Sequence, residues 1–341
     1  MRATPTETVP PRLRAWRSLP GDLARWAFWV KLRELLDPER PEQVARLQGA
    51  WRLQYAAARR QKALMRDELR RCFGAADEET VRRAYRIAFR VHTEELLLGK
   101  VDARTVRHFM VMEGTEHVDA ALARGRGAIL LLPHAGNVMM MIAAVSLGGY
   151  RYTQYAARGL APDAVAAAHP EVFGHNRWRA AVREAREAAE DRLPASFITL
   201  RTTVRHLFRC LERNELVGIA YDGRIGNRFV RVPYLGREAL LNPGAFRMAA
   251  RTGAAIVPTF NACPDDGPNV CSFGEPLWGD DPAELMRRFL AEAAEPWLRD
   301  HPAEYGIWLA HARARAAVDD HPMFTDYAPD DRWRKWPALG G

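Results

Sequence analysis

Residues 128–137 read Ala-Ile-Leu-Leu-Leu-Pro-His-Ala-Gly-Asn, and this stretch decides the fold. Its first five residues form a short apolar run of the kind found in strands that are buried on both faces. Pro133 interrupts regular structure, and Asn137 is a residue type that often caps the start of a helix. The stretch therefore predicts a buried strand that leads into a helix, with His134 at the carboxyl end of the strand.

Further apolar runs at 216–221 and 255–260 are also predicted to be buried strands, and longer helical stretches separate them. Alternation of this kind indicates the α/β fold class, with a central, mostly parallel sheet flanked by helices. We expect this domain to span residues 101–317. An N-terminal all-helical segment, 1–100, is predicted from apolar stripes at helical spacing, and 318–341 is expected to be an irregular extension.

The composition suits a globular protein with an arginine-rich surface. The chain has 341 residues, of which 48% are hydrophobic, and this is enough for a substantial core. Fifty basic residues outnumber 42 acidic ones, for a net charge of +8. The excess favours acidic partners such as phosphorylated cofactors, carrier proteins, RNA or anionic membranes, and guanidinium groups suit phosphate. Charge alone selects none of these, and we expect no DNA partner.

Two stretches raise the question of membrane contact. Residues 127–150 contain no charged side chain, but Pro133 and His134 near the centre argue against a membrane-spanning helix. Residues 23–36 predict an amphipathic helix, which either packs on its own domain or rests on a membrane surface. Because the first thirty residues lack the apolar core of a signal peptide, we expect a cytoplasmic protein, with peripheral contact at the inner membrane face as the alternative.

His134 is the centre of the predicted chemistry, because open α/β sheets bind ligands at the carboxyl ends of their strands. An imidazole there can take a proton from a hydroxyl or amine that attacks an activated carbonyl, provided that a partner holds its other nitrogen. Asp222 follows the predicted strand 216–221 and should reach the same sheet edge. The alternatives are that His134 only caps the helix and that Asp222 is a turn residue before Gly223.

Other site types have no support in the sequence. The histidines and the four cysteines show no metal-binding spacing, and neither a Gly-x-Ser-x-Gly elbow, a Walker loop nor a dinucleotide fingerprint is present. We therefore expect no metal and no cofactor.

Six motifs between residues 65 and 311 match a known family in order and spacing: Met112-Glu-Gly-Thr-Glu-His, the stretch 123–137, Tyr221-Asp-Gly-Arg, Val232-Pro-Tyr-Leu-Gly, Ala250-Arg-Thr-Gly-Ala-Ala-Ile-Val-Pro and His301-Pro-Ala-Glu-Tyr. With these motifs the chain resembles the bacterial late lipid A (lauroyl/myristoyl) acyltransferases and the phosphatidylinositol mannoside acyltransferases, in the lysophospholipid acyltransferase-like superfamily.

The resemblance departs from the family at one position. In the family an Asp or Glu stands five positions after the histidine and orients its ring, but here that position is Met139. A thioether is uncharged and only a weak acceptor, so it cannot take over this task. We expect Asp222 to replace the missing acid, and Met139 to pack in the core or to line an acyl channel.

Substrate-binding residues are suggested by the resemblance for Arg158 and by position in the sequence for the others. Arg158 is similar to the family arginine that follows the second strand and binds a phosphate of the donor or acceptor, although it could equally be a surface residue. Arg224 is expected to grip an anionic donor with it, and Gly223 to present a backbone N–H group to a developing oxyanion. Asn137 is a further candidate, with a helix N-cap as the alternative.

The implied reaction is acyl transfer without a covalent enzyme intermediate. The donor would be a thioester on acyl carrier protein or coenzyme A, and the acceptor a hydroxyl or amine of a small molecule, such as a specialised metabolite, or of a lipid. An alternative donor is aminoacyl-tRNA, which would use the arginines of the charged helix 178–192 and would acylate a small amine or hydroxylamine. A third hypothesis is a catalytically inactive binding homologue.

Overall fold

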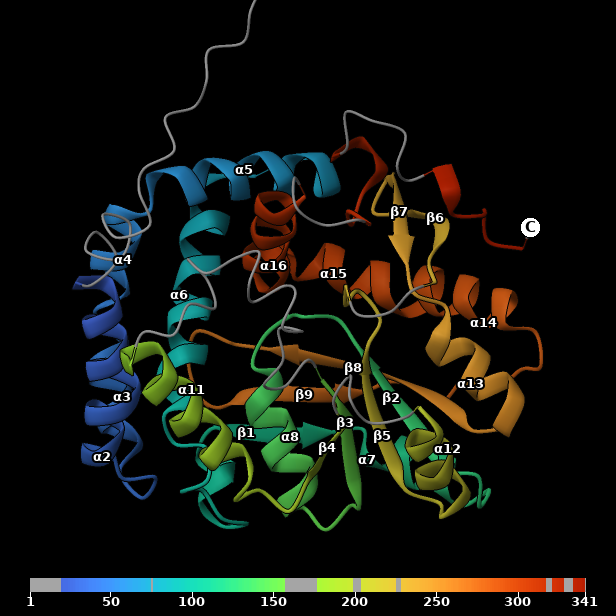
Figure 1. The fold of residues 1–341 in the computed structure, drawn as a ribbon, viewed down its shortest axis with the longest axis horizontal. Helices are drawn as coiled ribbons and strands as arrows, with labels where there is room; N and C mark the ends of the chain where they lie inside the picture. Colours follow the sequence, from blue (N-terminus) through green and yellow to red (C-terminus); the bar gives the residue numbers. More distant parts are fainter. Residues whose placement is uncertain are drawn as a thin grey trace, which may run out of the picture.

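The computed structural model describes residues 20–74, 76–156, 177–198, 204–224, 228–316, 321–327 and 334–340. The N-terminal part is helical, as predicted (Figure 1). Its elements are η1 (Ala27–Leu32), α2 (Arg33–Leu35), α3 (Pro41–Gln48), α4 (Trp51–Ala57), α5 (Arg59–Phe73) and α6 (Glu78–Glu95). Helix α6 begins where Asp77 accepts a hydrogen bond from the Thr80 N–H, which satisfies a free donor of the first turn.

A seven-stranded sheet lies below α5 and to the right of α2 and α3 in Figure 1. Its order is β1-β9-β8-β2-β5-β3-β4, and every neighbouring pair is parallel except β8 and β9. The strands are β1 (Met110–Glu113), β2 (Ala128–Leu132), β3 (Tyr152–Tyr155), β4 (Ser196–Ile198), β5 (Leu216–Ala220), β8 (Ala255–Ala262) and β9 (Asn269–Phe273). The predicted α/β fold with a mostly parallel sheet is confirmed.

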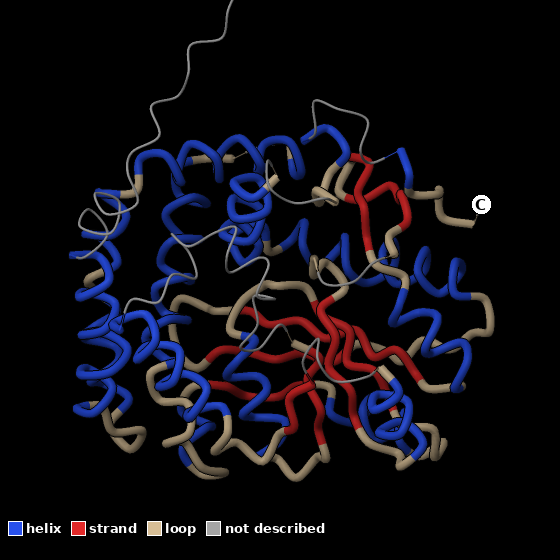
Figure 2. Tube along the Cα trace, viewed as in Figure 1, coloured by secondary structure: helices blue, strands red, loops and turns tan. Residues whose placement is uncertain are grey.

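Helices pack on both faces of the sheet (Figure 2). They are α7 (Thr115–Leu122), α8 (Val138–Leu147), α11 (Arg177–Glu190), α12 (Arg205–Glu212), α13 (Gly244–Thr252), α14 (Pro282–Arg288), η3 (Phe289–Ala294), α15 (Glu295–Asp300) and α16 (Pro302–Arg315). In β2, Ile129 and Leu131 belong to the core shared with α13 and α16, whereas Leu130 and Leu132 belong to the core shared with α7 and α8. The central strand is apolar throughout because both of its faces are buried.

The N-terminal helices and the α/β part share one core. Buried residues of α5 and α6 belong to the same cluster as those of β2, β5 and α16. Arg237 adds a polar link, because it donates to Glu68 of α5 at 2.7 Å and to Asp326 at 2.5 Å. Asp326 lies in the short helix η4 (Thr325–Tyr327), and Arg237 begins β7 (Arg237–Leu241), which pairs with β6 (Val230–Tyr234) in a separate antiparallel ribbon. The boundaries expected at residues 100 and 317 stay predictions.

The two stretches considered for membrane contact are part of the folded domain. Residues 127–150 form β2 and α8. In the amphipathic helix, Phe28 and Trp29 pack against the buried core, and Arg33 donates to the Leu98 carbonyl at 2.6 Å. Within the described part of the chain, no helix is both long enough and apolar enough to cross a membrane.

Candidate active site

The sheet register brings His134 and Asp222 together. Leu132 of β2 pairs with Ala220 of β5, and each strand is followed two residues later by one member of the pair. His134 Nδ1 and Asp222 Oδ1 are 2.6 Å apart, within hydrogen-bond distance. The predicted pairing of these two residues therefore has the geometry that it requires, at the carboxyl edge of two neighbouring parallel strands.

Three hydrogen bonds hold the Asp222 carboxylate, which is 0% exposed. Its Oδ1 bonds the imidazole, whereas its Oδ2 accepts from the His134 backbone N–H at 3.0 Å and from the Tyr305 hydroxyl at 2.7 Å. Burial raises the pKa of Tyr305 well above its ordinary value, and the nearby Asp222 charge adds to this shift. The Tyr305 hydroxyl therefore stays protonated and donates a hydrogen bond to Asp222. This bond offsets part of the free-energy cost of burying the carboxylate.

The imidazole is fixed in both orientation and tautomer. A neutral His134 that donates from Nδ1 to Asp222 has its free lone pair on Nε2. One face of the ring stacks on Trp308 of α16, with centroids 3.8 Å apart and planes 12° from parallel. Nevertheless the side chain is 37% exposed and lines a cavity. This arrangement suits a general base, because Nε2 is held in place and the ring stays accessible to a ligand.

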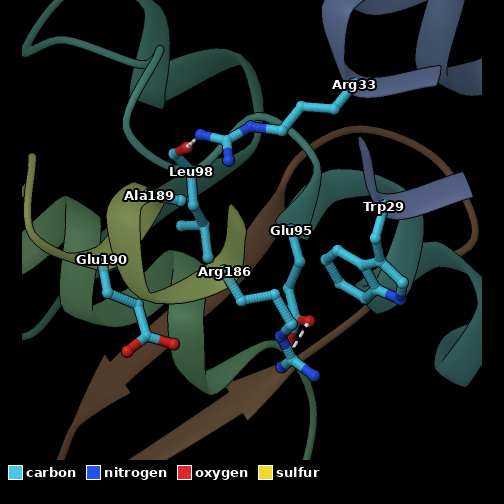
Figure 3. A pocket seen from close by; sticks show the side chains of 7 residues that line it. All are labelled: Trp29, Arg33, Glu95, Leu98, Arg186, Ala189 and Glu190. Atoms are coloured by element: carbon cyan, nitrogen blue, oxygen red, sulfur yellow. Dashed lines mark hydrogen bonds and ion pairs between the residues drawn. The ribbon is translucent and has the colours of Figure 1, made fainter. Parts of the chain in front are cut away.

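The cavity in front of His134 has a volume of about 1870 Å³. Single small-molecule pockets usually have about 300–1,000 Å³, so this cavity has room for two substrates. Apolar side chains form part of its lining, among them Phe28, Phe89, Val138, Met139, Ile142 and Phe197. The lining also includes Arg186 of α11, which pairs with Glu95 of α6 at 3.3 Å beside Trp29 (Figure 3).

The loop between His134 and α8 has a conformation that requires glycine. Gly136 has φ of +61°, and a Cβ at this position would collide with the Asn261 carbonyl oxygen. A positive φ disfavours L side chains, and a collision with backbone has no easy relief. Gly136 therefore lets the loop pass against β8 and keeps His134 at the sheet edge.

Asn137 caps α8, and the cap is anchored from the N-terminal helices. Its Oδ1 accepts from the Met140 N–H at 3.0 Å, and its Nδ2 donates to Glu94 of α6 at 2.8 Å. Glu94 also accepts from Arg90 at 2.7 Å and from Asn269 at 2.5 Å, and burial raises its pKa. Because the Asn137 amide is fully buried in these contacts, the structure gives it a positioning role. The substrate-binding role stays a prediction.

Met139 and Gly223 both line the cavity, as their predicted roles require. Met139 is in the first turn of α8 and also packs against the core, so both of its expected roles fit its place. Gly223 lies beside the imidazole, because a Cβ on it would be 3.7 Å from His134 Cε1. Its N–H donates to the Ala220 carbonyl at 3.3 Å, so that donor already has an acceptor.

Arg224 lines the cavity and also forms hydrogen bonds within the protein. Its Nη1 donates to the Leu240 carbonyl at 2.7 Å and its Nη2 to the His321 carbonyl at 2.8 Å. These bonds tie the strand β7 and the C-terminal segment to the end of β5. The anion-binding role expected of Arg224 stays a prediction. The other arginine predicted to bind an anion, Arg158, lies outside the described residues.

Tyr305 and Trp308 are the site residues that sequence reasoning missed. Tyr305 belongs to the quoted motif 301–305, so the motif pointed to it without indicating a contact with Asp222. Trp308 is next on the same helical face, and a signal for it was its spacing of three residues from Tyr305. Within the described residues no group of His, Cys, Asp and Glu could hold a metal ion.

Comparisons with known proteins point to acyltransferases. The family model for bacterial lipid A biosynthesis acyltransferase matches residues 23–313, which is most of the chain. Phosphatidylinositol mannoside acyltransferases from two strains of Mycobacterium tuberculosis, ATCC 25618 / H37Rv and CDC 1551 / Oshkosh, are each 28% identical over 149 residues. The similarity covers 44% of this chain and 43% of each relative, so the chain matches less than half the length of these curated relatives.

Proposed function

Because the chain belongs to the bacterial lipid A biosynthesis acyltransferase family, we propose that it transfers an acyl group with His134 as general base and Asp222 as the residue that orients it. The observation that carries this proposal is the 2.6 Å contact between His134 Nδ1 and the buried Asp222 carboxylate, beside a cavity with room for two substrates. In this proposal the acid comes from the end of β5. In the family pattern, by contrast, the acid stands on the helix after the histidine.

The proposed reaction is a direct displacement. His134 Nε2 takes the proton from the acceptor hydroxyl or amine while the acceptor attacks the thioester carbonyl carbon. The tetrahedral intermediate collapses as the C–S bond breaks, and the imidazolium returns its proton to the leaving thiolate. Asp222 stabilises the positive charge that His134 carries between these two steps. The protein forms no covalent bond to the acyl group.

The cavity supports a thioester donor with an apolar acyl chain, because Met139 and the aromatic residues of its lining offer apolar surface. The acceptor is a hydroxyl or amine on a small molecule or a lipid. An aminoacyl-tRNA donor has weaker support. Arg179 and Arg186 of α11, which could contact phosphates, instead pair with Asp22 and Glu95 at 2.8 Å and 3.3 Å. The intact His134–Asp222 contact speaks against an inactive homologue.

The test is thioester-dependent acyl transfer by the purified protein with acyl-coenzyme A and acyl carrier protein donors and a panel of amine and alcohol acceptors. We expect His134→Ala to lower kcat by about 10²–10⁴-fold, the usual contribution of a general base. Asp222→Asn should lower it nearly as much, because an amide cannot stabilise the imidazolium.

Far-ultraviolet circular dichroism and urea unfolding of both variants provide the control for folding. A folded Asp222→Asn protein with unchanged turnover would contradict the pairing. Full activity of His134→Ala would contradict the whole mechanism.

A further inference from the structure

Three buried tyrosines from three different elements meet beside the Asp222 carboxylate. Tyr221 directly follows β5, Tyr234 ends β6, and Tyr305 lies on α16, and each is at most 2% exposed. The hydroxyl oxygens of Tyr221 and Tyr234 are 2.8 Å apart. The Tyr234 hydroxyl donates to that of Tyr305 at 3.5 Å, and Tyr305 in turn donates to Asp222 at 2.7 Å. We call these three residues the tyrosine chain.

The number of hydroxyl protons fixes the direction of the tyrosine chain. Each phenol has one proton to donate. Because Tyr305 donates its proton to Asp222, it accepts from Tyr234. Tyr234 then has no proton left for Tyr221, so Tyr221 must donate to Tyr234. All three O–H dipoles therefore point along the chain toward the carboxylate, and hydrogen bonds aligned in this way polarise and strengthen one another.

The surroundings of the tyrosine chain are largely apolar. The Tyr221 ring packs edge-on against Phe289, with centroids 5.1 Å apart, and the Tyr234 ring stacks on Phe324 at 6.3 Å. Both phenylalanines are fully buried. Burial raises the pKa of all three tyrosines well above the ordinary value, and the Asp222 charge adds to each shift. The hydroxyls therefore stay protonated, and a lost partner costs more here than in water.

We propose that Tyr221 and Tyr234 act as positioning residues in acyl transfer. Through Tyr305 they hold the Asp222 carboxylate so that its Oδ1 faces the His134 imidazole. The last torsion of an aspartate side chain is soft, so a directed donor at Oδ2 decides where Oδ1 points. The inference rests on the proposed function, because that function supplies the reaction. It also gives the ribbon of β6 and β7 a task, since this ribbon brings Tyr234 to the site.

The first test is steady-state kinetics of phenylalanine variants of the full chain, with acyl-coenzyme A and the acceptor panel described above. Each variant removes one hydroxyl and keeps the ring. We expect Tyr305→Phe to lower kcat about tenfold, the effect of one hydrogen bond to a charged group, and Tyr234→Phe to lower it about threefold. Tyr221→Phe should have no larger effect than Tyr234→Phe. KM should stay the same in Tyr234→Phe, because Tyr234 is fully buried outside the cavity lining.

A double variant separates positioning from packing. If Tyr234 acts through Tyr305, adding Tyr234→Phe to Tyr305→Phe should lower kcat by less than about 1.5-fold, because the chain is already cut. Effects of the two substitutions that simply multiply would overturn the inference. The matched control is Tyr85→Phe. Tyr85 is 1% exposed, and its hydroxyl has no hydrogen-bond partner among the described residues, so kcat should stay unchanged.

Proton NMR of the His134 Nδ1–H group gives a readout that does not depend on turnover. Its signal is identified by its absence from His134→Ala. A carboxylate that loses a donor at Oδ2 is a stronger acceptor at Oδ1, so the resonance should move downfield in Tyr305→Phe and, by a smaller amount, in Tyr234→Phe. Tyr85→Phe should leave it in place.

The two measurements distinguish a failure of this inference from a failure of the proposed function. A protein that shows these NMR shifts without any acyl transfer would contradict the proposed function and still support the link from the tyrosine chain to Asp222. An unmoved His134 resonance in Tyr234→Phe overturns the inference, whatever the value of kcat.

Discussion

At the scale of single residues, the carboxylate that contacts His134 comes from Asp222 and not from position 139, where the family pattern has its acid. Asp222 contacts the imidazole and also the backbone N–H of the same histidine, so the carboxylate and the ring are held in one fixed unit. Tyr305 fills the remaining acceptor position of Oδ2. Met139 stands at the sequence position of the family acid, and its side chain lines the cavity.

Trp308 should stabilise the charged form of His134 as well as fix its position. A protonated imidazole over an indole face gains about 0.5–2 kcal/mol of cation–π energy, and the stacked geometry at 3.8 Å fits this contact. We expect Trp308→Leu to lower kcat about tenfold, because the imidazolium that forms during proton transfer loses this contact. Steady-state kinetics measure the effect.

Trp308→Phe is the matched variant for this prediction. It keeps an aromatic face, so it should lose less of kcat than the leucine variant. If the two variants lose kcat equally, the aromatic face has no influence and Trp308 acts only through packing.

The site residues differ in how far the sequence could predict them. His134 and Asp222 follow directly from the apolar strands that precede them, because parallel neighbours end at one edge. Tyr305 and Trp308 could not be placed in this way. Their contacts depend on how α16 packs across the sheet, and no local pattern in residues 302–315 encodes that packing direction.

At the scale of elements, the unit of β2, its following loop and α8 could be predicted almost to the residue. The strand has the predicted bounds, and Asn137 caps the helix. What could not be predicted is the anchor of that cap, because Glu94 comes from α6, a helix distant in sequence. The sequence around a buried Glu on an amphipathic helix does not indicate which distant residue the carboxylate will contact.

Gly136→Ala tests whether the loop conformation is required. We expect the free energy of unfolding to fall by about 1–3 kcal/mol, because alanine is strained at positive φ and its Cβ meets the Asn261 carbonyl. Acyl transfer should fall more than tenfold, since His134 moves with the loop. Urea unfolding and initial rates are the measurements.

Gly125→Ala is the control for that substitution. Gly125 has a similar φ of +70°, and the methyl group of an alanine there would have no other atom within 4 Å, so only the conformational strain remains. An equal loss of stability in the two variants would show that the contact with Asn261 has no influence.

At the scale of the whole molecule, α16 connects the helical N-terminal part to the site. It packs against α5 and α6, and it carries Tyr305 and Trp308 on the side of the sheet edge. Glu304, beside them, accepts a hydrogen bond from the Cys263 N–H at 2.7 Å. The N-terminal helices therefore support the helix that contacts both His134 and Asp222.

Glu304 should make the stability of the protein depend on pH. Burial raises its pKa from 4.5 to about 7. Between these two values the native state keeps a proton that the unfolded state has lost, so the contribution of Glu304 to stability falls as pH rises from about 4.5 to about 7. We expect Glu304→Gln to remove this loss. The free energy of unfolding of the variant minus that of the parent should therefore increase by about 1–3 kcal/mol from pH 5 to pH 8.

Urea unfolding of both proteins at pH 5, 6, 7 and 8 measures the difference. If the stability difference between the variant and the parent stays constant over this range, the Glu304 carboxyl does not titrate as described.

The acid that follows β5 has a consequence for how such enzymes can diversify. Under the proposed mechanism, proton transfer depends on two strand ends, and the first turn of α8 carries no part of it. Position 139 can then accumulate mutations under selection for a new acyl chain or acceptor while the enzyme stays active at each intermediate generation. Such an enzyme can acquire a new acyl chain or acceptor through substitutions at position 139, a route closed to relatives whose catalytic carboxylate stands on the helix.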